Sequence, residues 1–277
     1  MFAAASLARP LRSALDSFAA TGGAPARLVI AGSLDLARRV TELDERPDLV
    51  ALADEEIFKR LLLGRHAASY TRFATNRLVI AYADRSRHAD ALDSLSWPDV
   101  LSRDDVEVGR ADPGRAPVGY RTLLAWKLAE RRLARPGLAA RLELHAPRRN
   151  MRGSEAEMLA LVESGSADYV WAYESSALAA GLRVLRLPAW MDFSDPAQQA
   201  WYASESLRVA GRSPADSIVL GGEAIVYVLS VPRTAPHAQS ATRLAGYLVG
   251  QAGARALREA GLDVLSKPDT VIAKAKP

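Results

Sequence analysis

Cysteine is absent from this 277-residue sequence, which excludes disulfide bonds and metal sites built from thiolates. No run of about 18 apolar residues is present, although a membrane-spanning helix requires that length. Histidine is scarce, and the four histidines belong to no catalytic or metal-binding motif. A nucleophile with its base and a glycine-rich phosphate loop are missing as well. We therefore expect a protein that is not an enzyme.

The start of the sequence lacks the charged-then-apolar pattern of an export signal. Only residues 2–5 are available for a first strand before a helical pattern begins at Leu7. A strand that leads into a helix normally needs several more residues. We therefore expect that an export signal and part of this strand precede the printed sequence.

What the sequence does contain is typical of a globular protein: 49% of the residues are hydrophobic and 25% are charged. The net charge of +4 is spread as alternating arginines and carboxylates, for example along residues 99–110. A solvated surface has this pattern, whereas a nucleic-acid interface gathers its basic residues on one face. We expect no nucleic-acid partner.

Short β-rich segments alternate with helical patterns, which predicts an α/β fold with a largely parallel sheet. The strand at 27–31 precedes a helix from Leu34, and the strand at 49–53 precedes a helix over 55–63. Further elements are predicted as strands near 106–109 and at 169–173, and as helices at 119–132, 154–164, 238–249 and 252–260. Residues 187–217, rich in Pro, Ser and Asp, are predicted to loop over the surface.

Two long β-type runs, at 77–82 and 224–229, interrupt this alternation. They are best explained as two crossing strands of a hinge. The first lobe would then be discontinuous, with residues 1–77 plus 223–277, and the second lobe, residues 78–222, would be inserted into it.

Ser6 and Ser33 each lie where a short apolar run gives way to a helical pattern. The N-terminus of a helix favours negative charge and offers unpaired N–H groups, so two such ends could hold an oxyanion without a lysine. The alternative is that both serines are ordinary helix caps, because serine is among the commonest capping residues.

Three further segments offer contacts for an anion. The turn at 116–120 opens a helix whose Val118 and Gly119 amides could point at a ligand. Residues 150–154 precede a helix with a Ser154/Glu157 capping box. Tyr173 ends a strand, and its phenol can donate one hydrogen bond. The alternatives are a plain capped helix for the first two and ordinary packing for Tyr173.

These segments and several others occur in the order found in the molybdate/tungstate-binding proteins of ABC transporters, and most of all in the branch first described in archaea. The matching motifs are AASL at 4–7, GSL at 32–34, PDLVALAD at 47–54, FATN at 73–76, WPDVL at 97–101, DP at 112–113, PVGYR at 117–121, DY at 168–169 and IVY at 225–227. Each motif is weak alone, but together they cover nearly the whole chain.

The resemblance implies a two-lobed, periplasmic-binding-protein-like fold of type II, with mixed sheets flanked by helices. It implies a monomeric receptor that captures molybdate or tungstate in the cleft between its lobes and delivers it to an ABC permease, outside the cytoplasm and without a cofactor. By the same resemblance, Ser6 and Ser33 match the hydroxyl donors of the family and Val118 matches an amide donor. Met151 resembles a second amide donor, and Tyr173 resembles the tyrosine that completes the shell in the simpler bacterial molybdate receptors.

The sequence departs from the archaeal branch at two positions, where that branch has carboxylates that approach the metal of the anion. Ala116 and Ala172 stand there instead. A buried carboxylate beside a dianion is costly unless it bonds the metal, so losing one would favour losing both. We expect a four-oxygen anion without direct metal ligation. Glu174 or Asp112 could compensate if the alignment shifts by one or more residues.

Two other functions remain open from the sequence. One is a receptor for another anion, such as sulfate, phosphate or a small organic acid. The other is the effector-sensing domain of a transcription regulator, which shares the two-lobed architecture. Such a domain would normally follow a helix-turn-helix segment, and none precedes Ser6.

Overall fold

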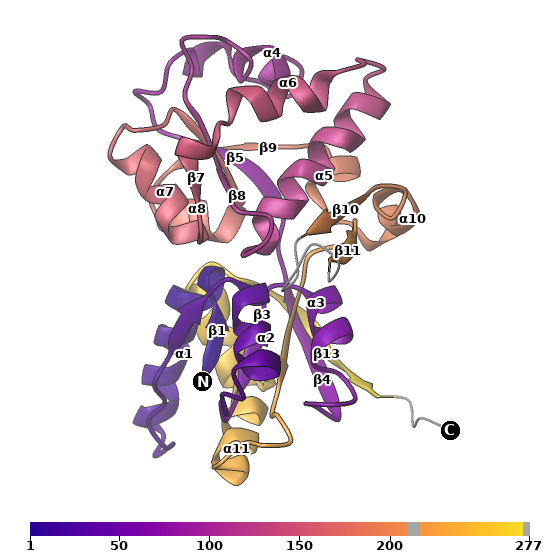
Figure 1. Ribbon diagram of the computed structural model, residues 1–277. Coiled ribbons are helices and arrows are strands. Elements are labelled where there is room, and N and C mark those ends of the chain that lie inside the picture. The colour runs from indigo at the N-terminus through magenta and orange to yellow at the C-terminus, as the bar shows by residue number, and fades with distance from the viewer. Residues whose placement is uncertain (210–216, 274–277) are drawn as a thin grey trace. The chain divides into compact units, whose positions relative to one another are not determined.

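The computed structural model describes residues 1–209 and 217–273. The chain forms two compact units (Figure 1). Unit 1 comprises Met1–Asn76 and Ile225–Pro277, and unit 2 comprises Arg77–Ala224. Within the described ranges, none of the helices combines the length and apolarity that crossing a bilayer requires.

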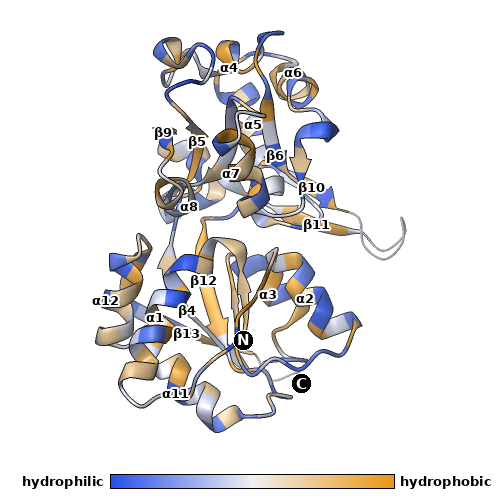
Figure 2. Ribbon diagram, turned by 90° about the vertical axis from the view of Figure 1, so that its left-hand side faces the viewer, coloured by the Kyte–Doolittle hydropathy of each residue, from blue (hydrophilic) through white to orange (hydrophobic). Residues whose placement is uncertain are grey.

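Unit 1 is built on a six-stranded mixed sheet with the order β13-β4-β12-β3-β1-β2. Strand β1 lies parallel to both β2 and β3, whereas β12 and β13 run antiparallel to their neighbours. The strands are β1 (Phe2–Ala4), β2 (Val29–Ala31), β3 (Val50–Leu52), β4 (Ser69–Thr75), β12 (Val226–Ser230) and β13 (Asp263–Ile272). In Figure 2, β12 stands out as a hydrophobic strand, in keeping with its place inside the sheet.

The helices of unit 1 bury one apolar face each. In α1, for example, Leu11, Leu15 and Phe18 recur at helical spacing and are buried, and the Phe18 ring lies 5.0 Å from that of Tyr247. The helical elements are η1 (Ala5–Leu7, a 3-10 turn), α1 (Ala8–Ala20), α2 (Ser33–Glu42), α3 (Glu55–Leu61), α11 (Ala238–Val249) and α12 (Gln251–Glu259).

Unit 2 contains a five-stranded mixed sheet with the order β7-β6-β8-β5-β9. Its strands are β5 (Leu78–Tyr82), β6 (Val108–Ala111), β7 (Met151–Arg152), β8 (Tyr169–Tyr173) and β9 (Arg183–Arg186). Every residue of β5 and β8 is buried, as expected for central strands covered on both faces. A separate two-stranded antiparallel sheet is formed by β10 (Ser206–Val209) and β11 (Ile218–Gly221).

The core of unit 2 is aromatic. Trp171 of β8 is fully buried and packs edge-on against Trp97 and Trp126, with ring centroids 5.3 and 5.9 Å away. The helical elements are α4 (Trp97–Val100), α5 (Pro117–Arg132), α6 (Leu138–His145), α7 (Glu155–Glu163), α8 (Glu174–Ala179), α9 (Ala189–Asp192), α10 (Gln199–Tyr202), and the 3-10 turns η2 (Ala89–Ala91), η3 (Arg148–Asn150) and η4 (Pro196–Gln198).

The predicted surface loop at 187–217 is wrong for much of its length. It contains α9, η4, α10 and β10, and it buries Met191, Phe193 and Tyr202. Composition misled the prediction because the prolines and serines lie among large apolar residues, which anchor the segment in the core. Residues 210–216 lie outside the described residues.

Two strands of unit 1, β4 and β13, were not predicted at all. Strand β13 carries Pro268 and pairs with β4 across a register shift between Val264 and Asp269. Proline is tolerated in sheets only at edge strands and bulges. Because β13 is an edge strand that contains a proline, its sequence lacks the pattern by which a strand is predicted. In unit 2, β6 begins at Val108 instead of position 106, and α5 begins at Pro117 instead of 119.

Candidate functional site

Ser6 and Ser33 follow two neighbouring parallel strands at the same register. Ala4, the last residue of β1, pairs with Ala31, the last residue of β2, and each serine comes two residues later. The carboxyl ends of parallel strands meet at one edge of a sheet, where α/β proteins bind their ligands. The backbone of unit 1 therefore brings both serines to the same edge.

Ser33 is fully buried and is the first residue of α2. Its Oγ accepts a hydrogen bond from the Ala53 amide, 3.0 Å away, just beyond the end of β3. A hydroxyl has one hydrogen to donate and two lone pairs. With its oxygen already accepting from Ala53, the Ser33 side chain is oriented to donate that hydrogen.

Ser6 lies in the short turn η1 and is 8% exposed. Its Oγ accepts a hydrogen bond from the Tyr227 hydroxyl, 3.0 Å away, and the Tyr227 oxygen in turn accepts from Nδ2 of Asn76, at 2.8 Å. The three side chains therefore form a directed chain that runs from Asn76 to Ser6. Because the Ser6 oxygen is the acceptor at the end of this chain, the Ser6 hydroxyl is oriented to donate its hydrogen, as that of Ser33 is.

Neither serine caps a helix through its side chain. The N-cap residues are Ala4 for η1, Leu7 for α1 and Gly32 for α2, and none of these ends has a side-chain cap. The ordinary-cap interpretation is therefore wrong for both residues. By contrast, Ser154 does cap its helix, since its Oγ accepts from the Glu157 amide.

In unit 2, Val118 is the second residue of α5 and is buried. Pro117 precedes it and has no N–H, so the Val118 amide is the first donor of the helix. The next amide, of Gly119, already donates to the Ala116 carbonyl at 2.9 Å. A side chain at Gly119 would meet the Ala111 carbonyl oxygen at 2.5 Å, so only glycine lets α5 start this close to the chain after β6.

Tyr173 ends β8 and is 1% exposed. Its hydroxyl oxygen accepts a hydrogen bond from Nη1 of Arg121, 2.6 Å away, and Arg121 is itself fully buried in α5. The guanidinium also lies 5.3 Å from the centre of the Tyr120 ring. Tyr173 is therefore a third hydroxyl whose oxygen is held by a donor of the protein.

The backbone of Tyr173 is held by a carboxyl group. Glu155, at the start of α7, accepts hydrogen bonds from the Tyr173 amide and from Ser176 Oγ. Burial raises the pKa of Glu155 to about 7, and these two bonds oppose the rise without cancelling it. A proton can therefore add to the shell around Tyr173 near neutral pH.

Met151 differs from the other four positions. Its amide donates to the Arg148 carbonyl at the end of η3, and its sulfur lies 3.4 Å from Nη1 of Arg110. Met151 pairs with Arg110 across β7 and β6. To donate to a ligand, the Met151 amide would have to break its hydrogen bond to the Arg148 carbonyl.

The two alanines at the carboxylate positions are both buried. Ala116 is the N-cap residue of α5, and Ala172 lies within β8 opposite Val79. The two carboxylates nearby have partners in unit 2. Glu174 forms ion pairs with Arg77 and Arg186, and Asp112 accepts from the Gly114 amide at 2.8 Å.

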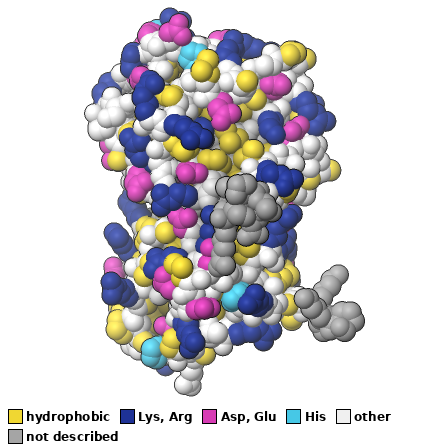
Figure 3. Space-filling view, viewed as in Figure 1, with side chains coloured by type: hydrophobic (Ala, Val, Ile, Leu, Met, Phe, Trp, Pro, Cys, Tyr) yellow, Lys and Arg dark blue, Asp and Glu magenta, His cyan; other side chains and the backbone are white. Residues whose placement is uncertain are grey.

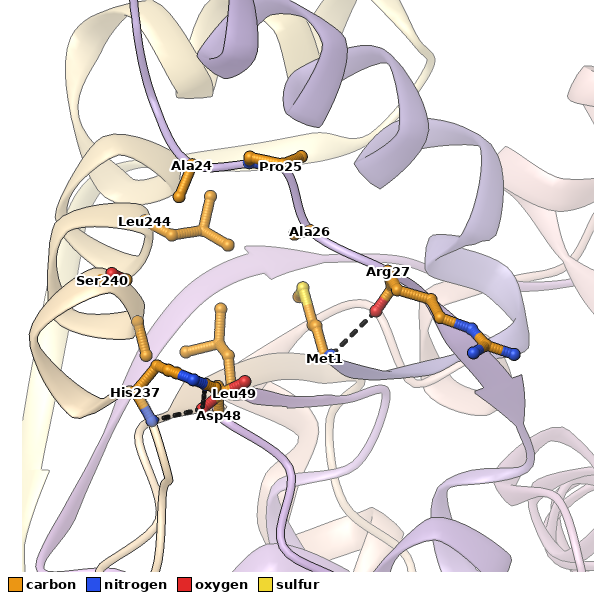
Figure 4. A pocket seen from close by; sticks show the side chains of 11 residues that line it. Met1, Ala24, Pro25, Ala26, Arg27, Asp48, Leu49, His237, Ser240 and Leu244 are labelled. Atoms are coloured by element: carbon orange, nitrogen blue, oxygen red, sulfur yellow. Dashed lines mark hydrogen bonds and ion pairs between the residues drawn. The ribbon is translucent and has the colours of Figure 1, made fainter.

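A cavity of about 340 Å³ in unit 1 contains none of the five predicted residues (Figure 4). Met1, Arg27 and Leu49 line it, and each of them comes just before β1, β2 or β3. The cavity therefore lies at the amino edge of these strands, whereas the serines lie at the carboxyl edge. The wall carries charges of both signs, because the Asp48 carboxylate, which accepts a hydrogen bond from the His237 amide, lies in it together with Arg27.

The charged side chains show no single-signed surface on the face in Figure 3, where arginines and lysines are interspersed with aspartates and glutamates. Among residues 1–209 and 217–273, no three His, Asp or Glu side chains are grouped to hold a metal ion. The candidate site is thus a set of hydroxyl and amide donors.

Three supporting residues, Asn76, Tyr227 and Glu155, were not predicted as part of the site. Asn76 and Tyr227 belong to the FATN and IVY motifs, so the sequence pattern contained them without indicating a role for them. Glu155 follows the capping serine, and nothing local in the sequence distinguishes it from an ordinary acidic residue of a first helical turn.

Comparison with known sequences matches residues 1–263 to the family described as bacterial extracellular solute-binding protein. An uncharacterized solute-binding protein of Petrotoga mobilis is 33% identical, over 89% of this chain and 77% of its own length. A putative ABC transporter molybdenum-binding protein of Haloferax volcanii is 34% identical, over 91% and 77%. The molybdate/tungstate-binding protein WtpA of Pyrococcus abyssi is 29% identical, over 86% and 74%.

Solved structures agree on the fold. The periplasmic molybdate-binding protein of Azotobacter vinelandii superposes with a TM-score of 0.68 at 16% identity, covering 96% of this chain and 98% of that one. The sulfate-binding protein SubI of Mycobacterium tuberculosis gives a TM-score of 0.65 at 17% identity, covering 96% and 86%. The predicted fold class, mixed sheets flanked by helices as in type II periplasmic binding proteins, is confirmed.

Proposed function

This chain belongs to the bacterial extracellular solute-binding proteins, and from that membership we propose that it is the molybdate or tungstate receptor of an ABC transporter. Two relatives support the choice of ligand, because their names are those of a molybdenum-binding and a molybdate/tungstate-binding protein. The relatives are named as binding proteins, one of them of an ABC transporter, in keeping with a binding role that involves no catalysis. The family is extracellular, so the protein acts outside the cytoplasm.

The observation that carries the proposal is shared by Ser6, Ser33 and Tyr173. The oxygen of each hydroxyl accepts a hydrogen bond from the protein, from Tyr227, Ala53 and Arg121 respectively. A hydroxyl held in this way presents its hydrogen, so all three side chains act as donors. Together with the Val118 amide, they suit a ligand that only accepts hydrogen bonds.

Such a donor set selects for protonation state. Molybdate and tungstate are fully ionised at neutral pH, whereas a protonated phosphate carries a hydrogen that needs an acceptor in the shell. We propose that Ser6, Ser33, Val118 and Tyr173 bind one tetrahedral anion, with Met151 joining them once its amide leaves the Arg148 carbonyl. With Ala116 and Ala172 at the carboxylate positions, the metal of the anion keeps four oxygens and takes no protein ligand.

The remaining parts of the proposal concern partners and place. We propose that the receptor is a monomer, that it works in the periplasm or elsewhere outside the cytoplasm, and that it delivers its anion to an ABC permease. No cofactor takes part, because hydroxyl and amide groups supply every contact.

Isothermal titration calorimetry with molybdate, tungstate, sulfate and phosphate tests the proposal. We expect tight binding of molybdate and tungstate, weaker binding of sulfate, and weak or no binding of phosphate near neutral pH. Binding of small organic acids alone would overturn the oxyanion assignment. Phosphate binding as tight as that of molybdate would contradict the donor-only site.

A further inference from the structure

Arg121 is the one fully buried arginine in the described part of the chain, with no exposed surface. It lies in α5, three residues after Val118, and its Nη1 donates to the Tyr173 hydroxyl at 2.6 Å. A single side chain thus links the two proposed donors of unit 2. Burying a guanidinium costs several kcal/mol unless negative charge or hydrogen bonds compensate it.

The distances bring this charge close to the proposed ligand. A hydrogen bond from the Tyr173 hydroxyl to an anion oxygen would be about 2.7 Å long. Arg121 Nη1 lies a further 2.6 Å behind that hydroxyl oxygen. The cation would therefore lie within roughly 6 Å of the bound oxygen, a range in which charges in proteins interact strongly.

Two effects follow from this arrangement. The hydrogen bond from Arg121 polarises the Tyr173 hydroxyl, which strengthens it as a donor. The fixed positive charge also favours a ligand with two negative charges over one with a single charge, because each unit of ligand charge adds to the attraction. The guanidinium lies 5.3 Å from the centre of the Tyr120 ring and 6.0 Å from that of the Tyr173 ring. Both rings therefore stabilise the cation through cation–π interactions.

We infer that Arg121 is a positioning residue that selects dianions: it fixes the Tyr173 hydroxyl as a donor and makes the site prefer a tetrahedral dianion over a monoanion of the same shape. The inference rests on the proposed oxyanion function and deepens it. It assigns the discrimination of charge to one side chain, whereas hydroxyls and amides recognise shape and protonation.

Perrhenate tests this inference because it is tetrahedral and similar in size to tungstate but carries one charge fewer. We would measure the dissociation constants of both anions at about pH 8 for the wild type, Arg121→Gln and Arg121→Lys. We expect the preference for tungstate over perrhenate to fall at least tenfold in Arg121→Gln. Arg121→Lys should keep most of that preference, because it retains the charge.

Tyr173→Phe is the matched control, since it removes the hydroxyl and keeps the guanidinium. It should raise the dissociation constants of tungstate and perrhenate by similar factors and leave the ratio of the two constants within about twofold of that of the wild type. Thermal unfolding followed by circular dichroism shows whether each variant is folded.

The outcomes separate the two proposals. If the wild type binds neither molybdate nor tungstate, the proposed function fails. If the wild type binds them and the ratio is unchanged in Arg121→Gln, the inference about Arg121 fails alone. If Arg121→Lys and Arg121→Gln both unfold or both lose the two anions equally, Arg121 is a structural residue and the inference is overturned.

Discussion

The two units hold their donor hydroxyls with groups of different charge. In unit 1, the oxygens of Ser6 and Ser33 accept from neutral groups, the Tyr227 hydroxyl and the Ala53 amide. In unit 2, Tyr173 is held by two ionisable side chains, because Arg121 donates to its hydroxyl and Glu155 accepts from its amide. Neutral partners fix direction alone, whereas charged partners also make a site respond to pH and to ligand charge.

This difference predicts that the two units have different roles in recognising an anion. The serines of unit 1 should contribute the same free energy to any tetrahedral anion of suitable size. The charged side chains that hold Tyr173 in unit 2 should make the site discriminate between anions of different charge, through Arg121, and respond to protons, through Glu155. Three substitutions test the division, and the expected effect decreases from Glu155→Gln through Ser33→Ala to Tyr227→Phe.

The largest effect is expected for Glu155→Gln, and it concerns stability. The pKa of Glu155 is about 7 in the folded chain because the carboxyl is buried, against 4.5 for an exposed carboxyl. The folded state therefore binds a proton more tightly than the unfolded state, and its stability falls as pH rises from about 4.5 to 7. Above pH 7, the charged carboxylate costs roughly 3 kcal/mol, a cost that glutamine does not carry.

We expect Glu155→Gln to match the wild type near pH 4.5 and to exceed its free energy of unfolding by roughly 3 kcal/mol at pH 8. Urea unfolding across this pH range measures the difference. Glu163→Gln, at the exposed end of the same helix, is the control and should change the free energy by less than about 0.5 kcal/mol. A difference that does not vary with pH would show that Glu155 does not titrate in this range.

The next effect is expected for Ser33→Ala, and it concerns affinity. The substitution removes one donor to the anion, and a hydrogen bond to a charged group contributes about 1.5–3 kcal/mol. We therefore expect the dissociation constant for molybdate and tungstate to rise at least tenfold by calorimetry. Because the partners of Ser33 are neutral, the loss should be the same for perrhenate and at every pH between 6 and 8.

Ser230→Ala is the matched control for this loss. Ser230 is also a buried serine of unit 1, and its hydroxyl donates to the Ser69 carbonyl, away from the donor set. The control should lose some stability and no affinity. An unchanged dissociation constant in Ser33→Ala would remove Ser33 from the binding site.

The sequence was sufficient to predict the strand and helix pattern around the donors. The strands that end two residues before Ser6 and Ser33 follow from short apolar runs followed by helical periodicity, and the strand at 169–173 was predicted at its true bounds. These elements are set by local pattern. Strand β13 depends instead on pairing with β4, which is far away in the chain. Its proline is unfavourable in most strands, so the local sequence does not indicate this pairing.

The supporting contacts could not be predicted for a similar reason. Tyr227 reaches Ser6 across 221 positions, and Arg121 reaches Tyr173 across 52. The sequence indicated which side chains could donate to an anion, but not that their oxygens are already engaged. That engagement is what distinguishes an oriented donor from an ordinary helix cap, and it comes from tertiary structure alone.

The smallest effect is expected for Tyr227→Phe, which removes the donor to Ser6 without touching the proposed ligand. The Ser6 hydroxyl would then lose its fixed direction, and Nδ2 of Asn76 would lose its hydrogen bond to the Tyr227 oxygen. A net hydrogen bond of this kind contributes about 0.5–1.5 kcal/mol, so we expect the dissociation constant to rise about twofold to tenfold. The substitution keeps an aromatic ring at position 227, so the contact with the Phe73 ring, 6.2 Å away, is retained.

Tyr70→Phe is the control for Tyr227→Phe, because it removes a buried hydroxyl of the neighbouring strand that donates to Glu55. It should leave affinity unchanged. Titrations of both variants with tungstate and perrhenate sharpen the comparison between the units. Since Tyr227 is neutral, its loss should weaken both anions by the same factor, in contrast to Arg121→Gln. A selective loss of tungstate in Tyr227→Phe would mean that unit 1 also discriminates by charge, and the division between the units would be wrong.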